Sequence, residues 1–426
     1  MERYEEYKDS GVEWIGEIPA GWGLKKLKYI AAMSRGFGIP KTKVTASGEP
    51  CVRYGELYTR YNGVIRDVVS RVTKQTFDAS ERIEPEELVM ALTGETKEDI
   101  GRTSANLSGG AVAVGGDTLL IRNHQEVGRF LSYALGSNYS EVQRYLDAQG
   151  EIIVHLSADK IRSEVLILPD PTTQVAIADF LDAKTEGIDD MVANCEREVE
   201  LLQEYRKAVV SEAVTKGLDP NAPMKDSGID WIGEIPEGWE VGKVKYAYIN
   251  RDSERVPVEA SKRNQSAEVL YPYYGASGVV DFISDFIFDE PLLLIGEDGA
   301  NLRLRNLPLI YAANGRYWVN NHAHILQPAE MMDYRYSFYQ LELVDLENYL
   351  TGSTQPKLTA ENLGLIPVAM PSMREQQEIA AYLDVKTAEI DSFIADYRSI
   401  TDKLREYRKS LISEAVTGKF KVPGVA

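Results

Sequence analysis

A long block of sequence occurs twice in this chain, and the second copy lies 202 residues after the first (position 180 becomes 382). FLDAKTEGID (180–189) matches YLDVKTAEID (382–391), and EYRKAVVSEAVT (204–215) matches EYRKSLISEAVT (406–417). In both copies apolar residues recur at steps of three and four over about six heptads, which is the spacing of a helix with one apolar seam. The sequence therefore predicts two long helices that are copies of each other.

The ends and the length of these helices constrain how they pack. Gly217 and Pro220 end the first copy and Gly418 ends the second, because glycine caps a helix and proline cannot continue it. Roughly 43 residues make a helix of about 64 Å at ~1.5 Å per residue. We expect the two seams to cover each other in an antiparallel coiled coil with pseudo-twofold symmetry. The alternative is that each seam packs on its own globular domain.

A second duplicated phrase contains two tryptophans. DSGVEWIGEIPAGW (9–22) returns as DSGIDWIGEIPEGW (226–239), and eleven of the fourteen positions are identical. We expect these tryptophans to be hinge or partner-docking residues, and the alternative is simple packing against the adjacent domain. They are Trp14, Trp22, Trp231 and Trp239.

The segments 24–170 and 240–371 share little sequence, but both are typical of a mixed α/β fold. Predicted strands in the first segment are ELVMAL, AVAVGGDTLLIR, EIIVHL and EVLILP, with a helix over 125–149. Predicted strands in the second are PLLLIGEDG, PLIYAAN, AHILQP and LGLIPVAMP, with a helix over 330–350. A Gly-Glu pair follows a predicted strand in each segment, at 94–95 and 296–297, and we expect the two pairs to occupy equivalent positions. The pattern predicts an α/β (α+β) protein of two globular domains, at 1–170 and 220–371, joined by long helices at 171–219 and 372–426.

Composition limits the setting and the partners. The net charge of −19 weakens an interpretation as a nucleic-acid-binding protein, because a polyanion needs positive surface. However, residues 24–48 and 299–329 contain no acidic side chain. Two distant cysteines and the lack of an apolar run of ~18 residues favour a reducing, cytoplasmic setting.

Loop residues that can read base edges gather beside these windows, since Arg, Lys, Asn and His side chains recognise bases through paired hydrogen bonds. The alternative for each is a hydrogen-bonded turn residue or a buried aromatic. In the first segment the candidates are Lys41, Lys43, Arg53, Tyr54, Thr93, Glu95, Arg102 and Thr103. In the second they are Tyr273, Tyr274, Ser277, Asp298, Asn301, Arg303, Arg305, Arg316, Asn320, Asn321, His322, Gln355 and Lys357.

No catalytic or metal-binding pattern is recognisable in the sequence. GETKEDIGRT (94–103) has glycines too far apart for a phosphate-binding loop and lacks its lysine. The pair His322 and His324 has no carboxylate or cysteine partner at a supporting spacing. We therefore predict a binding protein without catalytic residues, bound cofactor or metal.

Over nearly its whole length the chain resembles the DNA specificity subunits of Type I restriction–modification systems. The resemblance rests on the repeated WIGEIP phrases, the paired LD-x-KT and EYRK-x-x-x-SEAVT blocks, and the segment LLLIGEDGANLRLRNLPLIYAANGRYWVNNHAH. GSTQPKLTAENL followed by MPSMREQQEIA is also similar to the family, whereas LPDPTTQVAIA lacks the Glu-Gln pair of the second copy.

The resemblance implies a subunit without activity of its own. Each target-recognition domain would read one half of a split double-stranded DNA sequence, and the helices would set the spacing. Two S-adenosylmethionine-dependent methyltransferase subunits would dock on the repeated frame, and a translocating restriction subunit would join them. Alternatives are a non-catalytic scaffold of another DNA-modification complex, or the specificity chain of a combined cleavage–methylation enzyme.

Overall fold

The computed structural model describes residues 2–97, 100–148, 150, 154–263 and 268–425. The chain forms two compact units. Unit 1 consists of Met1–Glu196 with Ser399–Ala426, and unit 2 consists of Arg197–Arg398. Each unit therefore contains one of the two unlike segments together with parts of both long helices.

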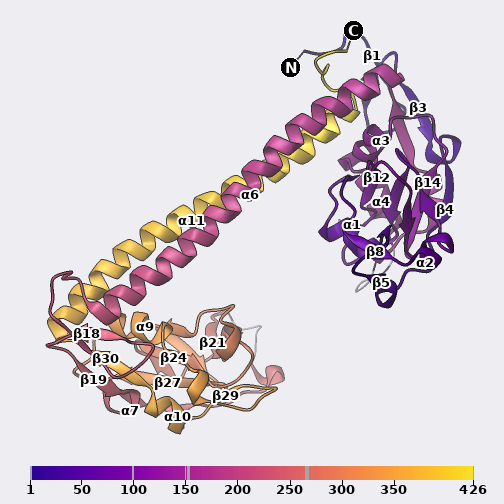
Figure 1. Cartoon of the computed structure of the whole chain (residues 1–426). Helices are drawn as coiled ribbons and strands as arrows, with labels where there is room; N and C mark the ends of the chain where they lie inside the picture. Colours follow the sequence, from indigo (N-terminus) through magenta and orange to yellow (C-terminus); the bar gives the residue numbers. More distant parts are fainter. Residues whose placement is uncertain (1, 98–99, 149, 151–153, 264–267, 426) are drawn as a thin grey trace. The chain divides into compact units, whose positions relative to one another are not determined.

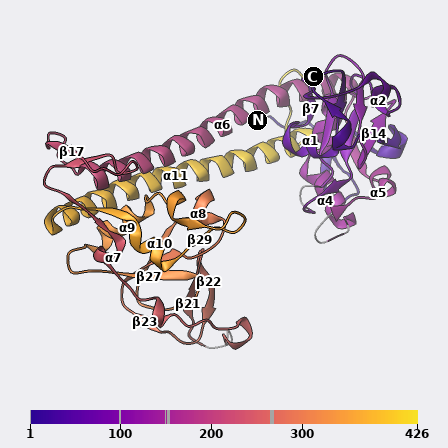
Figure 2. The ribbon, with the colours of Figure 1, turned by 60° about the horizontal axis from the view of Figure 1, so that its bottom comes forward.

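The long helices are α6 (Pro171–Lys216) and α11 (Met373–Val416). In unit 1, Arg408 of α11 donates two hydrogen bonds to Asp189 of α6, at 2.8 and 3.1 Å. In unit 2, Arg206 of α6 donates two to Asp391 of α11, at 2.8 and 3.2 Å. The two pairs are repeat mates, because Asp391 and Arg408 lie 202 residues after Asp189 and Arg206. The two helices run antiparallel in each unit (Figures 1 and 2), and each unit contains one of the two matched ion pairs.

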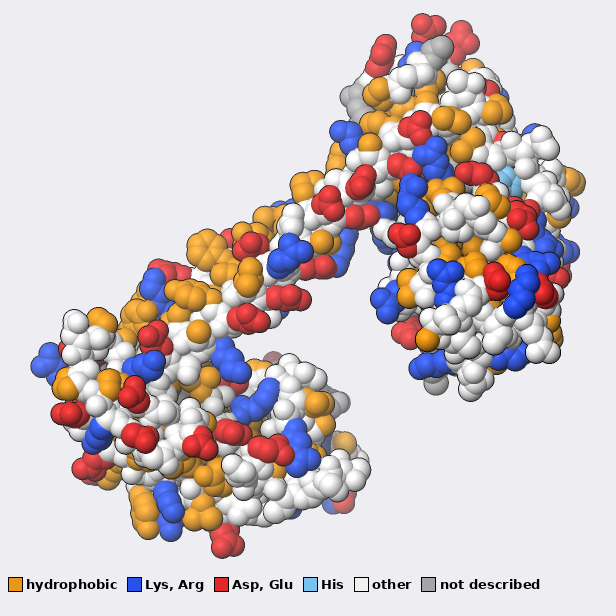
Figure 3. Space-filling model, viewed as in Figure 1, with side chains coloured by type: hydrophobic (Ala, Val, Ile, Leu, Met, Phe, Trp, Pro, Cys, Tyr) orange, Lys and Arg blue, Asp and Glu red, His pale blue; other side chains and the backbone are white. Residues whose placement is uncertain are grey.

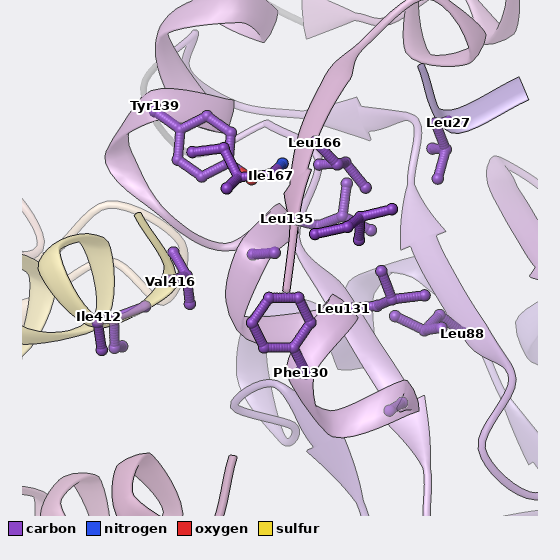
Figure 4. Packing of buried hydrophobic residues seen from close by; sticks show 14 of the residues in the cluster. Leu27, Leu88, Phe130, Leu131, Leu135, Tyr139, Leu166, Ile167, Ile412 and Val416 are labelled. Atoms are coloured by element: carbon purple, nitrogen blue, oxygen red, sulfur yellow. The ribbon is translucent and has the colours of Figure 1, made fainter. Parts of the chain in front are cut away.

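Both predicted alternatives for the apolar seams occur together: each seam packs against the other long helix and against a globular domain. Leu181 of α6 and Leu411 of α11 belong to the core of unit 1, together with Phe130 from the globular part. Figure 4 shows Ile412 and Val416 of α11 facing this globular packing. In unit 2 the corresponding core joins α6 and α11 to the sheet residues in the same way. Each seam thus packs on the other helix and on a domain at once.

The repeated phrases close the ends of these helices. Gly217 and Gly418 follow α6 and α11 with φ values of +75° and +70°, a conformation that favours glycine. A Cβ atom at Gly217 would lie 3.2 Å from the Trp239 ring, and one at Gly418 would lie 3.0 Å from the Trp22 ring. The two copies of the phrase therefore make the same contact in their own units.

Unit 1 is built around two five-stranded sheets. The first has the order β4-β14-β10-β12-β7 (Ala32–Arg35, Thr118–Arg122, Leu88–Ala91, Thr103–Asn106, Val64–Ile65). The second has the order β5-β8-β6-β13-β9 (Val44–Thr45, Ser70–Val72, Glu49–Val52, Val112–Val114, Arg82–Ile83). Short pairs are β1 with β2 (Tyr7–Asp9, Glu17–Pro19), β3 with β16 (Gly23–Lys26, Val165–Leu168) and β11 with β15 (Thr93–Gly94, Val154–His155). The helices are α1 (Tyr54–Thr59), α2 (Lys74–Asp78), α3 (Gly128–Leu135), α4 (Asn138–Asp147) and α5 (Ala158–Arg162), with 3₁₀ turns η1 (Leu27–Tyr29) and η2 (Lys41–Lys43).

Unit 2 repeats this plan with four-stranded sheets. Their orders are β20-β27-β24-β25 (Tyr248–Asn250, Ala323–Pro328, Leu292–Gly296, Ile310–Ala313) and β22-β21-β26-β23 (Gly278–Ile283, Tyr271–Gly275, Arg316–Val319, Phe288–Asp289). Short pairs are β17 with β18 (Met224–Asp226, Glu234–Pro236), β19 with β30 (Glu240–Lys243, Pro367–Met370) and β28 with β29 (Leu350–Thr351, Lys357–Leu358). The helices are α7 (Val244–Ala247), α8 (Asn301–Leu304), α9 (Tyr334–Glu342) and α10 (Ala360–Leu365), with 3₁₀ turns η3 (Asp252–Glu254), η4 (Ala260–Lys262) and η5 (Glu347–Tyr349).

Pairing shows that the two units share one topology. β6 and β13 are parallel, and β9 is antiparallel to β13. β21, β26 and β23 repeat this arrangement in the same chain order. The central strands β10 and β24 are buried throughout, which explains their continuous apolar sequences. Differences lie in the connections: unit 1 inserts α1 and β7 between β6 and β8, and unit 2 inserts α8 between β24 and β25.

Some predicted elements differ from the structure. The helix predicted over 125–149 is two helices, α3 and α4, because Gly136 and Ser137 interrupt it. The helix predicted over 330–350 is only α9, followed by η5. The strand predicted over 111–122 is two strands, β13 and β14. Of the strand predicted at EIIVHL, residues 151–153 lie outside the described residues.

The start of α6 also corrects the sequence comparison. Gln174 occupies the place of Gln376: each side-chain amide bonds the carbonyl five residues earlier, in Pro169 and Pro371. Only the glutamate of the Glu-Gln pair is therefore missing from the first copy, where Thr173 stands in place of Glu375. In the part of the chain that the structure describes, no helix is long and apolar enough to span a bilayer.

Matched leucines test whether each unit depends on its own part of the seam. Leu181 and Leu383 are repeat mates and both are fully buried. We predict that Leu181→Ala and Leu383→Ala each reduce the free energy of unfolding by about 2–5 kcal/mol, because each leaves a cavity. Hydrogen exchange of the full chain should show faster exchange in unit 1 for the first variant and in unit 2 for the second. Leu201→Ala, at an exposed position of α6, is the control, and equal loosening of both units by either core variant would contradict the prediction.

Candidate functional site

In unit 1, several polar side chains meet where strand β10 ends. The N–H of Leu92 donates to the carbonyl of Asp117 at 2.8 Å, and its carbonyl accepts from the N–H of Leu156 at 2.9 Å. Thr93, the next residue, pairs with His155 across β11 and β15, and its Oγ1 lies 3.2 Å from His155 Nδ1. These main-chain bonds bring a hydroxyl, a carboxylate and an imidazole together.

A pocket of about 350 Å³ opens at this place. It is lined by Arg35, Gly36, Leu92, Thr93, Asp117, Thr118, His155 and Leu156. The side chains of Arg35, Asp117 and His155 are exposed. Gly36 is required at the edge, because a Cβ atom there would lie 2.1 Å from the carbonyl oxygen of Gly115. We call Arg35, Thr93, Asp117 and His155 the unit 1 strand-end site.

In unit 2, the same main-chain bonds form where β24 ends. The N–H of Glu297 donates to the carbonyl of His322 at 2.8 Å, and its carbonyl accepts from the N–H of Leu358, also at 2.8 Å. The main chains of Asp298 and Lys357 form an isolated antiparallel β-bridge. We call Asp298, His322 and Lys357 the unit 2 strand-end site.

The shared hydrogen bonds and strand register align the two sites residue by residue, since Ala91 pairs with Thr118 as Gly296 pairs with Ala323. The backbone places are therefore equivalent, whereas the side chains are not. The equivalent pairs are Leu92 and Glu297, Thr93 and Asp298, Asp117 and His322, His155 and Lys357, and Leu156 and Leu358.

This alignment corrects the equivalence predicted from the two Gly-Glu pairs. Glu297 occupies the place of Leu92, so Gly94 and Glu95 lie three positions further along the chain than their supposed mates. The two-letter match is a coincidence, because the main-chain bonds between strands, and not local sequence, define the register.

Ion pairs hold the side chains of the unit 2 site. Glu297 accepts from Arg255 at 2.5 Å and pairs with Lys357 at 3.0 Å. Burial raises the pKa of Glu297, but the hydrogen bonds from Arg255 and Lys357 outweigh this effect, so the pKa lies below its ordinary value. His322 Nδ1 lies 2.8 Å from Asp298 Oδ2. The cluster therefore presents a lysine and an imidazole whose positions are fixed by carboxylates.

A buried histidine supports this cluster from behind. His324 is almost completely buried, its Nδ1 lies 2.5 Å from Asp252 Oδ2, and its Nε2 lies 2.8 Å from the carbonyl oxygen of Leu358. A carboxylate and a main-chain carbonyl thus hold the two ring nitrogens in place. Burial raises the pKa of Asp252, but the hydrogen bond and charge of His324 and the N–H of Ile325 outweigh it, so the pKa is lowered.

Most of the predicted residues of unit 1 lie outside the strand-end site. Thr93 belongs to it, and Arg53 packs against Gly115 in the turn that leads to Asp117. The other exposed residues do not line the pocket of this site: Lys41, Lys43, Tyr54, Glu95 and Arg102. Thr103 is buried in β12, and its hydroxyl donates to the carbonyl of Gly101. The prediction that Thr103 contacts DNA is therefore corrected, because this side chain is part of the sheet interior.

The structure brings a larger share of the predicted residues of unit 2 together. Asp298, His322 and Lys357 form the site, and Asn321 lies beside His322. Gln355 lies two residues before Lys357, and Ser277 is exposed in the β21–β22 turn whose Ala276 carbonyl approaches Gly296.

Other predicted residues of unit 2 have structural partners. Tyr273 is buried, and its hydroxyl accepts a hydrogen bond from the Val258 N–H. Tyr274 packs edge-on against Tyr317. Asn320 is buried, and its side-chain oxygen accepts a hydrogen bond from the His322 N–H. Asn301 holds its loop through Leu307 and Pro308, and Arg303 bonds Ser353 and pairs with Glu347. Arg305 bonds the carbonyls of Glu342 and Val344, and Arg316 pairs with Asp289. For Tyr273 and Asn320, burial corrects the prediction of a direct DNA contact to one of support for the loops.

The tryptophans divide between packing and exposure. Trp22 and Trp239 are core residues, and Trp239 Nε1 donates to Glu375 at 3.0 Å. Trp231 is partly buried. These contacts favour the packing interpretation for Trp22 and Trp239. Trp14 is half exposed, and docking stays a prediction for it.

Sequence reasoning missed Arg35, Asp117 and His155 in unit 1, and Arg255 and Glu297 as supports in unit 2. Strand register was the missing information, because Asp117 and His155 lie far apart in sequence. Among the described residues no group of three or more His, Cys, Asp or Glu side chains could hold a metal ion.

The charge is finely mixed at the surface. On the face drawn in Figure 3, basic and acidic side chains alternate over both units and along the helices. The acid-free sequence windows therefore do not produce broad positive faces there. The two sites differ in the charged groups at their strand ends.

The chain thus has a duplicated frame that presents two equivalent sites of unlike chemistry. A family model described as Type I restriction modification DNA specificity domain matches residues 236–393. A putative type I restriction enzyme specificity subunit of Haemophilus influenzae is 34% identical over 134 residues, which are 32% of this chain and only 34% of that protein. The putative MjaX specificity subunit of Methanocaldococcus jannaschii is 22% identical and aligned over 96% of both chains.

The fold itself has a solved counterpart. A chain from a structural study of complex assembly and conformational transition of the type I R-M system superposes with a TM-score of 0.69, at 14% identity, over 94% of this chain and 99% of that one. At this identity the likeness concerns the fold. The family model identifies residues 236–393 as a Type I restriction modification DNA specificity domain, and the chain as a whole is similar to type I specificity subunits in sequence and in fold.

The buried pair in unit 2 gives a pH-dependent prediction. Because the folded-state pKa of Asp252 is lowered, its stabilising contribution is present above the unfolded pKa of about 3.9 and is lost as the pH falls through the folded value. Asp252→Asn should therefore destabilise the protein at pH 7, and the difference from wild type should shrink at pH 3. Urea unfolding at both pH values measures this difference. A constant difference would contradict a charged Asp252 in the folded state.

Proposed function

We propose that each unit of this chain reads one half of a split sequence in double-stranded DNA. The observation that carries the proposal is the equivalence of the two strand-end sites: identical main-chain bonds present different side chains in the two units. One fold with two unlike reading surfaces suits a target whose halves differ. Arginine, lysine, histidine and carboxylate groups are the groups that recognise base edges.

The repeated frame supports a role in assembling partners. Trp22 and Trp239 make equivalent buried contacts at the helix ends, and the Asp189–Arg408 and Asp391–Arg206 pairs are equivalent along the helices. The frame, with the half-exposed Trp14 and its partly buried repeat mate Trp231, therefore occurs twice. Two copies of one surface suit two identical partners. We therefore assign the frame to the docking of two methyltransferase subunits, joined by a restriction and translocation subunit.

Catalysis belongs to those partners in this proposal. The chain itself acts without catalytic residues, and S-adenosylmethionine is used by the methyltransferase subunits. The setting is the cytoplasm, where the DNA lies. The net charge of −19 leaves much of the contact with phosphates to the partners, since phosphate binding needs positive surface.

Mapping of methylated bases tests this function. A host that carries the chain with its methyltransferase subunits should methylate one split sequence, and a mobility shift with the same subunits should prefer that duplex to a scrambled one. Equal binding of the two duplexes would favour a scaffold that does not read DNA. Methylation by the isolated chain would contradict the absence of catalysis.

The helices give a second prediction, about the spacing of the half-sites. Four residues inserted after Glu198 in α6 and after Ile400 in α11, which are repeat mates, add about one turn and 6 Å to each helix. We expect the accepted gap to lengthen by about one or two base pairs, at ~3.4 Å each, with both half-sites unchanged. Four residues inserted between Asp219 and Pro220, beyond α6, are the control. A gap that stays constant in the double insertion would contradict a spacing role for the helices.

A further inference from the structure

We propose that the strand-end sites select the bases in the two half-sites, and that these two equivalent sites do so by opposite chemistry. Lys357 of unit 2 donates hydrogen bonds to a guanine, and Asp117 of unit 1 accepts a hydrogen bond from the amino group of an adenine or a cytosine. This inference rests on the proposed function and deepens it, because it assigns base recognition to particular side chains.

The first argument is position. Both sites lie where a buried central strand, β10 or β24, leaves the sheet, so their backbone is fixed by hydrogen bonds on both sides. The side chains themselves reach solvent: those of Lys357 and His322 are each 52% exposed. A rigid backbone with an exposed side chain is what hydrogen-bond recognition requires, because the direction of each bond must be fixed before binding.

The second argument concerns Lys357. Its Nζ lies 3.0 Å from Glu297, and Arg255 holds the other oxygen of that carboxylate at 2.5 Å. Glu297 and Arg255 are therefore positioning residues that limit where the ammonium can lie. An ammonium group only donates. In the major groove guanine presents two acceptors, N7 and O6, and lysine is one of their usual partners.

The third argument concerns Asp117. It occupies the backbone place of His322, next to His155, which occupies that of Lys357. An ionised carboxylate only accepts, so it can pair with the amino group of cytosine or adenine and not with the acceptors of guanine. Asp117 has a φ of +59°, a conformation that aspartate and asparagine tolerate better than most residues. Asp117 lines the pocket of the unit 1 site and is exposed there.

The register also explains why unit 1 has an arginine in its site. Leu119 occupies the place of His324, and Arg35, which pairs with Leu119, occupies the place of Asp252. In unit 2 the carboxylate at this place is engaged by the buried imidazole. In unit 1 a leucine offers no such partner, and Arg35 is exposed at the pocket. The two sites therefore differ in the groups behind them as well as in the groups that face outward.

The experiment maps methylated sequences in a host that carries the full chain with its methyltransferase subunits. We expect Lys357→Ala to lower the preference for guanine at one position of one half-site by roughly 5- to 150-fold, the range for one well-made base contact. The other half-site should stay unchanged and serves as an internal control. Asp117→Asn should relax one position of the opposite half-site only, because an amide both donates and accepts.

Two further variants separate recognition from folding. Lys357→Arg should keep the guanine, since arginine donates to the same acceptors. Lys262→Ala removes a lysine of unit 2 that pairs with Glu259 on its own turn, and both half-sites should persist. Loss of all methylation with both Lys357→Ala and Lys357→Arg would overturn the inference in favour of a structural role. Loss of the guanine preference with Lys357→Ala, but not with Lys357→Arg, would support the inference.

Failure of the inference differs from failure of the proposed function. If Lys357→Ala and Asp117→Asn keep every base preference of the wild type, the split target stands and these residues do not select bases. If the wild-type complex methylates no split sequence, the proposed function itself is wrong. If both variants alter the same half-site, the assignment of one unit to each half fails.

Discussion

The apolar seam shared by α6 and α11 is the contact on which both units depend. The core of unit 1 contains Leu411 and Val416 from the end of the chain, and the core of unit 2 contains Val209 and Ala213 from the end of α6. Unit 1 therefore cannot complete its core from a continuous stretch of sequence. Its closure joins residues separated by more than half of the chain, which carries a large loop-closure entropy. Hydrophobic burial along the seam has to offset that entropy before the polar pairs between the helices can form.

The features that could be predicted from the sequence are those with a long period. α6 and α11 end within a residue or two of their predicted ends, since several heptads of spacing and a terminal glycine define them. Buried central strands such as β10 and β24 were equally visible as continuous apolar runs. Elements of two to four residues with mixed polarity, such as β8 or β9, have too few positions for a period to be recognised. The break between α3 and α4 depended on two residues, Gly136 and Ser137, in an otherwise helical pattern.

The candidate site was only partly predictable for a different reason. Residue types that can bind bases are visible in a sequence, and Asp298, His322 and Lys357 were found in this way. Their grouping depends on strand register, which arises from main-chain hydrogen bonds that carry no sequence signal of their own. The Gly-Glu pairs show the consequence: a local match suggested one alignment and the bonds of Leu92 and Glu297 define another. Asp117 and His155 could not be joined without that register.

The same property explains how one frame can carry two different sites. The bonds that fix the strand ends use backbone atoms, so a leucine and a glutamate can occupy the same place without altering the fold. Exposed substitutions away from special contacts usually change stability by less than about 0.5 kcal/mol. Frame residues such as Trp22 and Leu181 lack this freedom, because they fill closely packed space. Divergence at the strand ends and near-identity in the frame are therefore two results of one physical difference, between side chains that pack and side chains that reach solvent.

Charge has a related consequence for a protein that selects among DNA sequences. Lys357 lies beside Glu297, and His322 beside Asp298, so the unit 2 site has little net positive charge with which to attract phosphates in general. Nonspecific binding comes almost entirely from such attraction. A base contact made by a lysine whose charge is locally balanced adds affinity for the right sequence and little for any other. Under the proposed function, in which partner subunits supply the contacts to the DNA backbone, the acidity of the chain would favour discrimination over nonspecific binding.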